Sequence, residues 1–459
     1  MRPRNLAARD QLPVMLGRQP RATASELAVS LGVSVATLHR LLAELPPELM
    51  LTAGRTRRTR YALRRPLRGE YTDLPLYAID TAGQARSVTT LALVQPQGML
   101  MPLPDETWPV PPESRDGWWD GLPYPLYDIR PQGYLGRQFA RAEHERLGVS
   151  PNPEEWPDDD IVFVLSRAGT DASGNLLLGE AAYRRWLQGK LSPAEPVTDT
   201  ELGEHYATRA QDALQAGLAG SSAGGEFPKF TAIRRAGATT PHVLVKFSGA
   251  GEAAAERRWA DLLVCEHLAL ECAATLPGVT SARTRIVGYA GRIFLEAERF
   301  DREGEHGRLP VCTLDALNAA FLGATTTDWT QLITQLDRQA LLEAGIVHAV
   351  EHLWWFGHLV ANTDMHLGNL SFHVAPKLRL APAYDMVPMA YAPLPGGEVP
   401  PRDFNPPLPL PAQRPTWQAA AKAAVTFWRR ASADGRVSSP FQALCAANAH
   451  AIEHAAARV

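Results

Sequence analysis

The sequence has few cysteines and lacks a long apolar run. Its four cysteines have spacings that suit neither a disulfide framework nor a zinc site: Cys265, Cys272, Cys312 and Cys445. No apolar N-terminal segment resembles a secretion signal, and no run of about 18 apolar residues could span a membrane. We therefore predict a cytoplasmic protein with reduced cysteines and no membrane partner.

Lysine is absent from the first 70 residues, which carry thirteen arginines and five acidic residues, a net charge of +8. The remainder of the chain carries −11, which together give the total of −3. This asymmetry indicates that only the N-terminal segment contacts a polyanion. The apolar fraction of 45% is that of a soluble protein with a sizeable core. At about 150 residues per domain, the length indicates roughly three domains.

The basic N-terminal segment has the pattern of a helix-turn-helix. A short helix is predicted near residues 9–17, and Thr23 with Glu26 forms a capping box that begins a second helix. Gly32 ends that helix, and Ser34 is a suitable N-cap for a third. The third helix would bury Leu38, Leu41 and Leu42. Its outward side chains would then be Val35, Thr37, His39 and Arg40.

Two short strands around Gly54 are predicted to follow this third helix. Four arginines suited to phosphate contacts lie there: Arg55, Arg57, Arg58 and Arg60. The arrangement predicts a winged helix-turn-helix that binds DNA through these arginines and through Thr37, His39 and Arg40. The alternative is a small protein-interaction module with a solvated basic face.

Residues 71–200 carry weaker patterns. Alternation over 76–102 predicts a small β-subdomain, and 118–136 reads as a packed loop rich in aromatics, proline and glycine. Helices are expected near 138–147 and 179–188. The acidic run 154–160 is interpreted as a solvated loop and not as a metal site, because its carboxylates are adjacent and flanked by proline.

A polar loop after an apolar helix carries the clearest chemistry. Asp364 is followed five residues later by Asn369, and Asp385 comes just after a short β-like run. The same Asp-to-Asn spacing occurs in the catalytic loop of protein kinases. There, one carboxylate orients the attacking hydroxyl, while an amide and a second carboxylate hold Mg²⁺ on the phosphates. Asn362 and His366 lie in the same loop.

The upstream sequence supplies what such a site requires. A Gly/Ser-rich loop at 219–229 includes Gly224 and Gly225, whose backbone could approach phosphate oxygens closely. Lys246 ends an apolar strand, from which it could pair with the phosphates of ATP. The order of glycine loop, strand lysine, helix, strands, catalytic loop and final carboxylate predicts ATP-dependent phosphoryl transfer.

These motifs resemble the HipA-type serine/threonine kinases of bacterial toxin–antitoxin systems, in the branch with its own N-terminal helix-turn-helix. The resemblance covers about residues 75–455 and is strongest over 219–390. Five pieces carry it: SSAGGEFPK, HVLVKFS, AERFDR, ANTDMHLGNLSF and LAPAYDM. It implies an α+β chain with a winged helix-turn-helix followed by a two-lobed HipA-like kinase fold, in which a β-rich N lobe precedes a helical C lobe. The expected domains are 1–70, 71–200, 201–310 and 311–459.

The resemblance also implies roles for individual residues. Asp364 would be the catalytic base, and Asn369 and Asp385 would be the Mg²⁺ ligands. His366 would support the catalytic loop or touch a phosphate. The remaining expected nucleotide contacts are Lys246, Lys229, Gly224 and Gly225 at the phosphates, and Glu298 and Phe300 at the adenine hinge. Family members autophosphorylate a serine in the glycine-rich loop, which corresponds to Ser222 with Ser221 as a neighbour. Their known substrates are aminoacyl-tRNA synthetases, whose phosphorylation leads to growth arrest or persistence.

Two departures from the family pattern concern the nucleotide site. Glu226 adds a negative charge to the glycine-rich loop, which could weaken ATP binding unless Lys229 or Arg234 compensates. The carboxylate partner of Lys246 has several candidates on the following helix, and we favour Glu256 over Asp261 and Glu266. Asp301 and Arg302 after the hinge suit a structural ion pair as well as nucleotide contacts.

Two further segments are interpreted without a functional role, and two alternative functions are considered. His348, His352 and His358 suit core or cap positions better than a metal site, and 392–415 is expected to be a proline-rich surface loop. One alternative function is a DNA-binding transcriptional regulator with a degenerate, nucleotide-sensing kinase body. Another is an interaction protein whose N-terminal domain docks a protein. In relatives the DNA-binding fold belongs to a separate antitoxin, and whether this chain also has one stays open.

Overall fold

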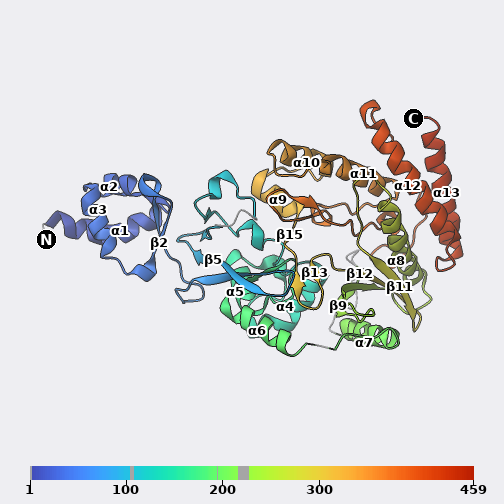
Figure 1. Cartoon of the computed structure of the whole chain (residues 1–459), viewed down its shortest axis with the longest axis horizontal. Coiled ribbons are helices and arrows are strands. Elements are labelled where there is room, and N and C mark those ends of the chain that lie inside the picture. Colours follow the sequence, from blue (N-terminus) through green and yellow to red (C-terminus); the bar gives the residue numbers. More distant parts are fainter. Residues whose placement is uncertain (1–2, 104–107, 194, 216–226) are drawn as a thin grey trace.

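A computed structural model gives the positions of residues 3–103, 108–193, 195–215 and 227–459. The molecule is elongated and combines helices with several small sheets (Figure 1). The N-terminal helices lie at one end, and α12 and α13 lie at the other. The expected α+β composition is therefore present.

Three helices and a small antiparallel sheet form the N-terminal end of the molecule. Its elements are α1 (Pro3–Arg18), β1 (Ala22–Thr23), α2 (Ala24–Leu31), α3 (Val35–Ala43), β2 (Met50–Ala53) and β3 (Arg60–Leu63), with the strands in the order β1-β3-β2. The predicted capping box of Thr23 and Glu26 is present, Gly32 ends α2 with φ of 63°, and Ser34 caps α3. Between α2 and α3 the chain bends by 99°.

The β2–β3 hairpin is attached to the sheet that follows it. The Arg65 amide donates to Leu93 O, and the Gln95 amide donates to Leu63 O, each at 2.9 Å. One small apolar cluster also contains residues of both parts: Leu51, Ala62, Ala92, Val94, Leu100 and Trp118. The hairpin is thus held to the rest of the chain by backbone bonds and by shared burial.

The next part is a five-stranded antiparallel sheet with helices. The strand order is β7-β6-β5-β4-β8, with bounds β4 (Leu74–Ile79), β5 (Ala85–Leu93), β6 (Met99–Leu100), β7 (Trp118–Trp119) and β8 (Leu176–Leu178). Its helices are α4 (Gly133–Leu147), α5 (Asp158–Ala168) and α6 (Glu180–Leu191).

The interpretation of the acidic run as a solvated loop is wrong in part, because Asp158, Asp159 and Asp160 form the first turn of α5. Carboxylates are favourable there, where helical N–H groups lack partners. Asp159 and Asp160 also pair with Arg65 and Arg68. These distant partners, which local sequence does not reveal, favour the helix.

A four-stranded antiparallel sheet occupies the centre of the chain, in the order β11-β12-β10-β9. Its strands are β9 (Lys229–Ile233), β10 (His242–Phe247), β11 (Thr284–Tyr289) and β12 (Arg292–Glu298). The helix α7 (Leu202–Gln215) packs on the face that carries Val245, Phe247 and Phe294. Leu295 belongs instead to the core that contains α8 (Ala254–Ala273). Since neighbouring strand residues point to opposite faces, Lys246 points toward α8.

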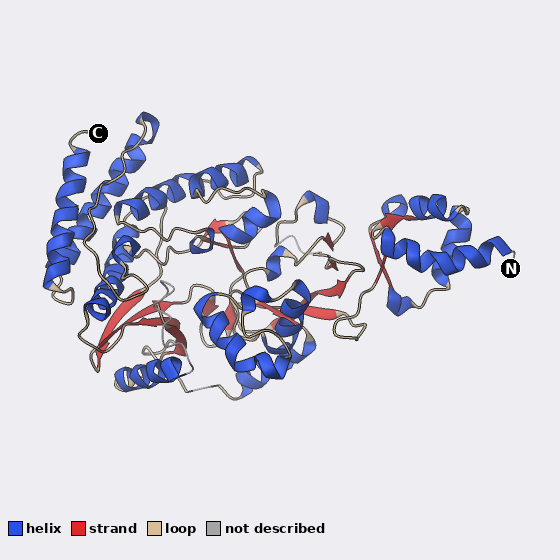
Figure 2. Ribbon diagram, turned by 180° about the vertical axis from the view of Figure 1, so that it is seen from behind, coloured by secondary structure: helices blue, strands red, loops and turns tan. Residues whose placement is uncertain are grey.

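The remaining elements form a mostly helical part (Figure 2). Its helices are α9 (Leu314–Phe321), α10 (Trp329–Arg338), α11 (Ile346–Leu359), α12 (Arg414–Ala433) and α13 (Ser439–Ala456). Its strands are β13 (Arg302–Glu303) with β14 (Gly307–Arg308), and β15 (Val311–Thr313), β16 (Ser371–His373) and β17 (Arg379–Leu380) in the order β15-β16-β17. Residues 393–410 lack helix and strand, as predicted, and α12 begins at Arg414.

Within the described ranges, no single helix is long and apolar enough to cross a membrane, and only the bent pair α2 and α3 meets the length and composition test when joined.

Candidate active site

Lys246 is held by two carboxylates from distant parts of the chain. Its Nζ donates to Glu266 Oε1 and Oε2 at 2.7 and 2.8 Å, and it donates a further short bond to Asp385 Oδ1. Lys246 and Glu266 are buried, whereas the Asp385 side chain keeps 32% of its surface exposed. The lysine therefore joins β10, α8 and the segment after β17.

The electrostatics at this junction favour the charged forms of Lys246 and Asp385, whereas burial raises the pKa of Glu266. Burial opposes the charge of Lys246, but the carboxylates of Asp385 and Glu266 outweigh burial and raise the pKa of the lysine. Burial likewise opposes the charge of Asp385, but Lys246 and Lys229 outweigh it and lower the pKa of this carboxyl to about 2. The Asp385 carboxyl is thus ionised at neutral pH.

The expectation that Glu256 pairs with Lys246 is wrong, because the partner is Glu266. Glu256 lies in the first turn of α8, against the loop after β10, where a Cβ on Gly251 would collide with its carboxylate. Glu266 lies two to three turns further along. The sequence did contain a signal, because Glu266 falls four residues after Leu262 and four before Leu270, on the buried stripe of the helix.

Asn362 fixes the start of the loop that carries Asp364. Its Oδ1 accepts from the Asp364 amide at 2.9 Å, and its Nδ2 donates to Asp385 O at 3.1 Å. One buried side chain thereby ties the loop to the segment that carries Asp385. Sequence reasoning placed Asn362 in this loop without giving it a role.

The predicted base and the predicted amide ligand are also joined directly. Asn369 Nδ2 donates to Asp364 O at 2.7 Å, and Asn369 is buried while Asp364 is exposed. Among the described residues, no group donates a hydrogen bond to the Asn369 Oδ1. His366 is exposed, and its Nδ1 accepts from the Gly368 amide at 3.1 Å, which starts the 3-10 turn Leu367–Asn369. His366 therefore supports the loop, and its position also lowers the pKa of Asp385.

Backbone geometry around Asp385 is unusual for a side chain with a Cβ. Its φ of 58° lies in the left-handed region, which costs on the order of 1–3 kcal/mol and is concentrated at functional sites. The preceding Tyr384 donates to Gly368 O at 2.5 Å and lies 2.7 Å from Ser371 Oγ. The surrounding hydrogen bonds thus hold Asp385 against the catalytic loop.

The residues expected at the hinge line a neighbouring cavity of about 680 Å³. Glu298 and Phe300 contribute to its wall, together with Leu244, Ala297 and Tyr384. Its volume lies within the range of about 300–1,000 Å³ that is usual for small-molecule sites. Gly368 and Tyr384 also line the cavity, and they adjoin Asn369 and Asp385 in the sequence. Lys246, Asp364 and Asn369 themselves do not line it.

The glycine-rich loop falls mostly outside the described residues. This applies to Ser221, Ser222, Gly224, Gly225 and Glu226. The described chain resumes at Phe227, which is buried and whose ring centroid is 5.8 Å from Lys246 Nζ. Lys229 begins β9 opposite Lys246 in the sheet register, and its charge acts on Asp385. Sequence reasoning missed Phe227, which lies within the GGEFPK motif.

Arg234 takes part in a different set of contacts. It pairs with Asp199 at 3.3 Å and with Glu296 at 3.5 Å. Glu296 lies on β12, an inner strand of the central sheet, and Asp199 lies shortly before α7. Arg234 is therefore already engaged in ion pairs.

Asp301 and Arg302 form a structural ion-pair cluster behind the hinge. Asp301 accepts from Arg299 at 2.9 Å and from Arg302 at 2.6 Å, and both arginines also bond Asp171. These two arginines lower the pKa of Asp301 despite its burial. The cluster connects the hinge to the loop after α5.

The three histidines of α11 differ in environment. His348 is exposed, His352 is half-buried, and the half-buried His358 packs edge-on against Trp354 with 4.4 Å between ring centroids. Among the described residues, no three His, Cys, Asp or Glu side chains gather in a way that could hold a metal ion. A cation beside Asp385 would therefore depend on amide and substrate oxygens as well.

The predicted DNA contacts lie on the surface of the N-terminal part. His39 and Arg40 are exposed on α3, Thr37 is half-buried, and Leu38, Leu41 and Leu42 are buried as predicted. Arg55, Arg57 and Arg58 are exposed around the tip between β2 and β3. Arg60 is exposed on β3, but its Nη1 already donates to Arg21 O at 2.8 Å.

Comparison with known proteins gives two family matches. Residues 70–187 match a family described as the middle domain of YjjJ-like toxins, and residues 221–452 match a family described as the HipA-like C-terminal domain. The chain is 36% identical to Toxin YjjJ of Escherichia coli (strain K12) over 434 residues, which are 94% of this chain and 95% of that protein.

Two solved structures are similar at lower identity. One is the HipA chain in a complex of HipA, HipB and operator DNA from Shewanella oneidensis MR-1, with 15% identity, a TM-score of 0.49, and coverage of 84% of this chain and 97% of that chain. The other is the proinflammatory kinase CtkA of Helicobacter pylori, with 12% identity, a TM-score of 0.33, and coverage of 50% and 90%.

Proposed function

Since the chain belongs to the HipA family of toxins, we propose that it is an ATP- and Mg²⁺-dependent kinase that phosphorylates serine or threonine hydroxyls of a protein. The proposal includes a two-lobed arrangement, with the central sheet and α8 in the N lobe and the helices from α9 onward in the C lobe. The observation that carries it is the bonding of Lys246 to both Glu266 and Asp385. A buried strand lysine between a helix carboxylate and a carboxylate after the catalytic loop is the layout that phosphoryl transfer uses.

Each residue has a role that its contacts support. Lys246 offers positive charge to the nucleotide phosphates, and Glu266 orients it and compensates for its burial. Asp364 is exposed at the loop surface, where its carboxylate can accept the proton of an incoming hydroxyl. Asn362 and Asn369 fix the backbone on either side of Asp364. His366 holds the turn between Asp364 and Asn369.

The donor set at Asp385 and Asn369 fits Mg²⁺. Both offer oxygen, Asp385 is ionised at neutral pH, and the Asn369 Nδ2 is used by Asp364 O, which leaves Oδ1 for a cation. Mg²⁺ is commonly bound through one or two carboxylates together with substrate phosphates, so a larger carboxylate cluster is not required. When bound, Mg²⁺ would neutralise charge on the transferred phosphoryl group. Glu298 and Phe300, at the cavity wall, are the proposed neighbours of the adenine.

Nucleotide binding tests this proposal without a known protein substrate. Calorimetric titration of the full chain with ATP and Mg²⁺ should give saturable binding. Lys246→Met should weaken the binding at least about tenfold, because a bond between charged groups is lost. Lys422→Met is a matched control, because Lys422 is exposed on α12. Equal affinity in wild type and Lys246→Met would contradict the proposed role of the lysine.

The proposed targets of phosphorylation follow from the family. Within the chain, Ser222, with Ser221 as its neighbour, is the proposed autophosphorylation site, in a loop that also contributes Gly224, Gly225 and Lys229 to nucleotide binding. The proposed external substrate is a protein, with an aminoacyl-tRNA synthetase as the first candidate. Phosphoproteomics after induction of wild type and of Asp364→Asn would identify this substrate. Its phosphorylation sites should be present with wild type and absent with Asp364→Asn.

We further propose that the N-terminal part is a winged helix-turn-helix that binds DNA. The 99° bend between α2 and α3 agrees with the angle of about 90–120° in helix-turn-helix motifs. The exposed arginines of the β2–β3 tip suit phosphate contacts, and His39 and Arg40 project from α3. Because the hairpin is bonded to the next sheet, DNA binding and the kinase body would be mechanically connected, as autoregulation requires. A separate antitoxin is a further proposed partner.

The main alternative is a DNA-binding regulator whose kinase body only senses nucleotide. Nucleotide binding without any transfer of phosphate would favour it. A second alternative is an N-terminal domain that docks a protein. Because DNA binding releases counterions, affinity for DNA should fall steeply with salt if the groove is contacted, and a lack of such dependence would favour protein docking.

A further inference from the structure

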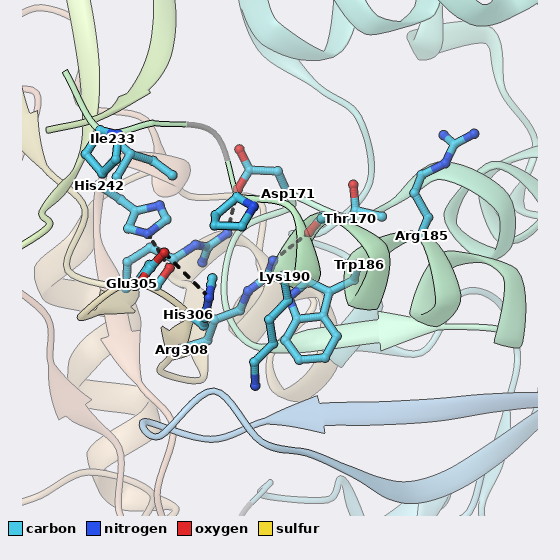
Figure 3. Close-up of a pocket in the computed structure, with 14 residues that line it drawn as sticks. Thr170, Asp171, Arg185, Trp186, Lys190, Ile233, His242, Glu305, His306 and Arg308 are labelled. Atoms are coloured by element: carbon cyan, nitrogen blue, oxygen red, sulfur yellow. Dashed lines mark hydrogen bonds and ion pairs between the residues drawn. The ribbon is translucent and has the colours of Figure 1, made fainter.

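A second, smaller cavity lies between α6, the start of β10 and the β13–β14 hairpin (Figure 3). Its volume is about 190 Å³. In Figure 3, His242, His306 and Arg308 lie on one side of it, and Trp186 and Lys190 of α6 lie on the other. The wall also includes Arg185 and Arg302, so basic side chains outnumber the acidic ones, which are Asp171 and Glu305.

The arginines beside this cavity are not balanced by carboxylates. Arg302 and Arg308 are buried beside the half-buried Arg299, and the carboxylates near them are Asp171 and Asp301. Both carboxylates are bonded by Arg299 and Arg302. In the described part of the chain, Arg308 has no carboxylate within ion-pair distance. Three guanidinium groups thus share two negative charges.

Arg308 is the member whose charge is left uncompensated. The residue is 6% exposed, its Nη2 donates to Thr170 O at 2.6 Å, and its buried Nη1 has no hydrogen-bond partner among the described residues. Burial and the nearby Arg302 lower the pKa of Arg308 to about 9. A buried charge without a partner is costly, so an anion beside Arg308 would be stabilised.

We propose that this cavity is a binding site for a phosphate-sized oxyanion, held by Arg308 with Lys190. The imidazoles of His242 and His306 also line the wall, but both face Glu305, with His242 Nε2 2.9 Å from Glu305 O and His306 Nε2 3.7 Å from Glu305 Oε1. The size supports a small ligand, since about 190 Å³ is below the range of about 300–1,000 Å³ for drug-sized molecules. Lys190 Nζ donates one hydrogen bond to Gly83 O at 2.5 Å, and its other two N–H groups can donate to an anion. The site is distinct from the proposed nucleotide cleft, although Thr170, Asp171 and Arg185 line both cavities.

Titration of the full chain with inorganic phosphate tests the site. Calorimetry should show binding to wild type in chloride buffer of matched ionic strength. Arg308→Met should weaken the binding about tenfold or more, and Lys190→Met should weaken it several-fold, since each removes a charged donor. Arg184→Met is the matched control on the same helix, because Arg184 is exposed and bonds Glu180. It should bind phosphate as wild type does.

A thermal measurement keeps the test independent of the stability of each variant. Phosphate should raise the Tm of wild type and of Arg184→Met, as a ligand of the native state does. It should leave the Tm of Arg308→Met nearly unchanged. If Arg308→Met does not fold, Lys190→Met decides, because Lys190 is only half-buried.

Three outcomes would overturn the proposal. These are an absence of phosphate binding in wild type, equal binding in wild type and both cavity variants, and loss of binding in Lys229→Met alone. The last outcome would place the anion in the nucleotide cleft. Titration with phenyl phosphate distinguishes the source of the phosphoryl group. If phenyl phosphate binds more weakly than inorganic phosphate, the natural ligand is a free anion. If it binds equally or more tightly, the natural ligand is a phosphomonoester.

Discussion

Lys246 and Asp385 are 139 residues apart in the chain and form a direct ion pair. The lysine lies near the end of β10, and the aspartate follows β17 with a left-handed backbone. Glu266 on α8 binds the same Nζ, so one buried cation fixes the relative positions of three elements. Asn362 extends the connection to Asp364. The proposed chemistry depends on this arrangement.

Replacing Glu266 tests which carboxylate supports the lysine. Glu266→Gln should lower the free energy of unfolding by about 2–3 kcal/mol, because Lys246 would stay buried with a single carboxylate. Glu256→Gln on the same helix is the matched control and should cost less than about 1 kcal/mol, since that side chain is only half-buried at the start of α8. Urea unfolding measures both. Equal losses in the two variants would contradict the assignment of Glu266.

Local signals predicted much of the fold. The caps at Thr23, Gly32 and Ser34 are short-range backbone contacts, and they occur as predicted. The strand that carries Lys246 and the loop from Asn362 to Asn369 were also found from their patterns. In each case the residues that specify the structure are neighbours in the sequence.

Features that depend on contacts between distant residues were harder to predict from the sequence. The partner of Lys246 was misassigned because several acidic residues lie on α8. Asp261 and Glu266 are both buried there, and only the packing of the helix shows that Glu266 reaches the lysine. The helix start at Asp158 was missed because its supporting arginines come from about 90 residues earlier. The role of Phe227 beside Lys246 depends on the return of β9 next to β10.

Asn362 should act as a positioning residue for Asp364. Asn362→Leu removes the bonds to the Asp364 amide and to Asp385 O, and we expect kcat to fall about 10- to 100-fold with a smaller change in KM for ATP. Asn362→Asp, which retains an acceptor for the Asp364 amide, should recover part of the loss. Thr363→Ala changes the adjacent exposed residue and should leave kcat near wild type. A fall in ATP affinity alone would argue against this role.

Asp128 should make stability depend on pH in mildly acidic solution. Burial raises the pKa of Asp128 to about 6, although the amide and hydroxyl of Thr313 donate to it. Since the folded state holds this proton more tightly than the unfolded state, stability should fall as pH rises from about 4 to about 6 and stay level above.

The comparison of wild type with Asp128→Asn isolates this contribution. The difference in unfolding free energy between the two proteins should change over that pH interval and be constant above about pH 6. Urea unfolding at several pH values provides the measurement. A difference that is constant from pH 4 to 7 would show that Asp128 titrates normally.

The arginines at the β2–β3 tip should contribute to DNA affinity without selecting a sequence. Arg57→Ala and Arg58→Ala should each weaken binding similarly for all duplexes and reduce the slope of log affinity against log salt by about 1. Arg9→Ala is a control in α1, where Arg9 pairs with Glu44. Unchanged salt slopes in both tip variants would exclude phosphate contacts there.

Transfer of phosphate by the chain to itself tests the central claim most directly. Wild type and Asp364→Asn are incubated with ATP and Mg²⁺ and analysed by peptide mass spectrometry, with circular dichroism as the control for folding. We predict phosphate on Ser222 or Ser221 in wild type and none in the folded variant, which should also lose toxicity. Equal phosphorylation of both proteins would place the base elsewhere, and neither phosphate nor nucleotide binding in wild type would contradict the kinase assignment.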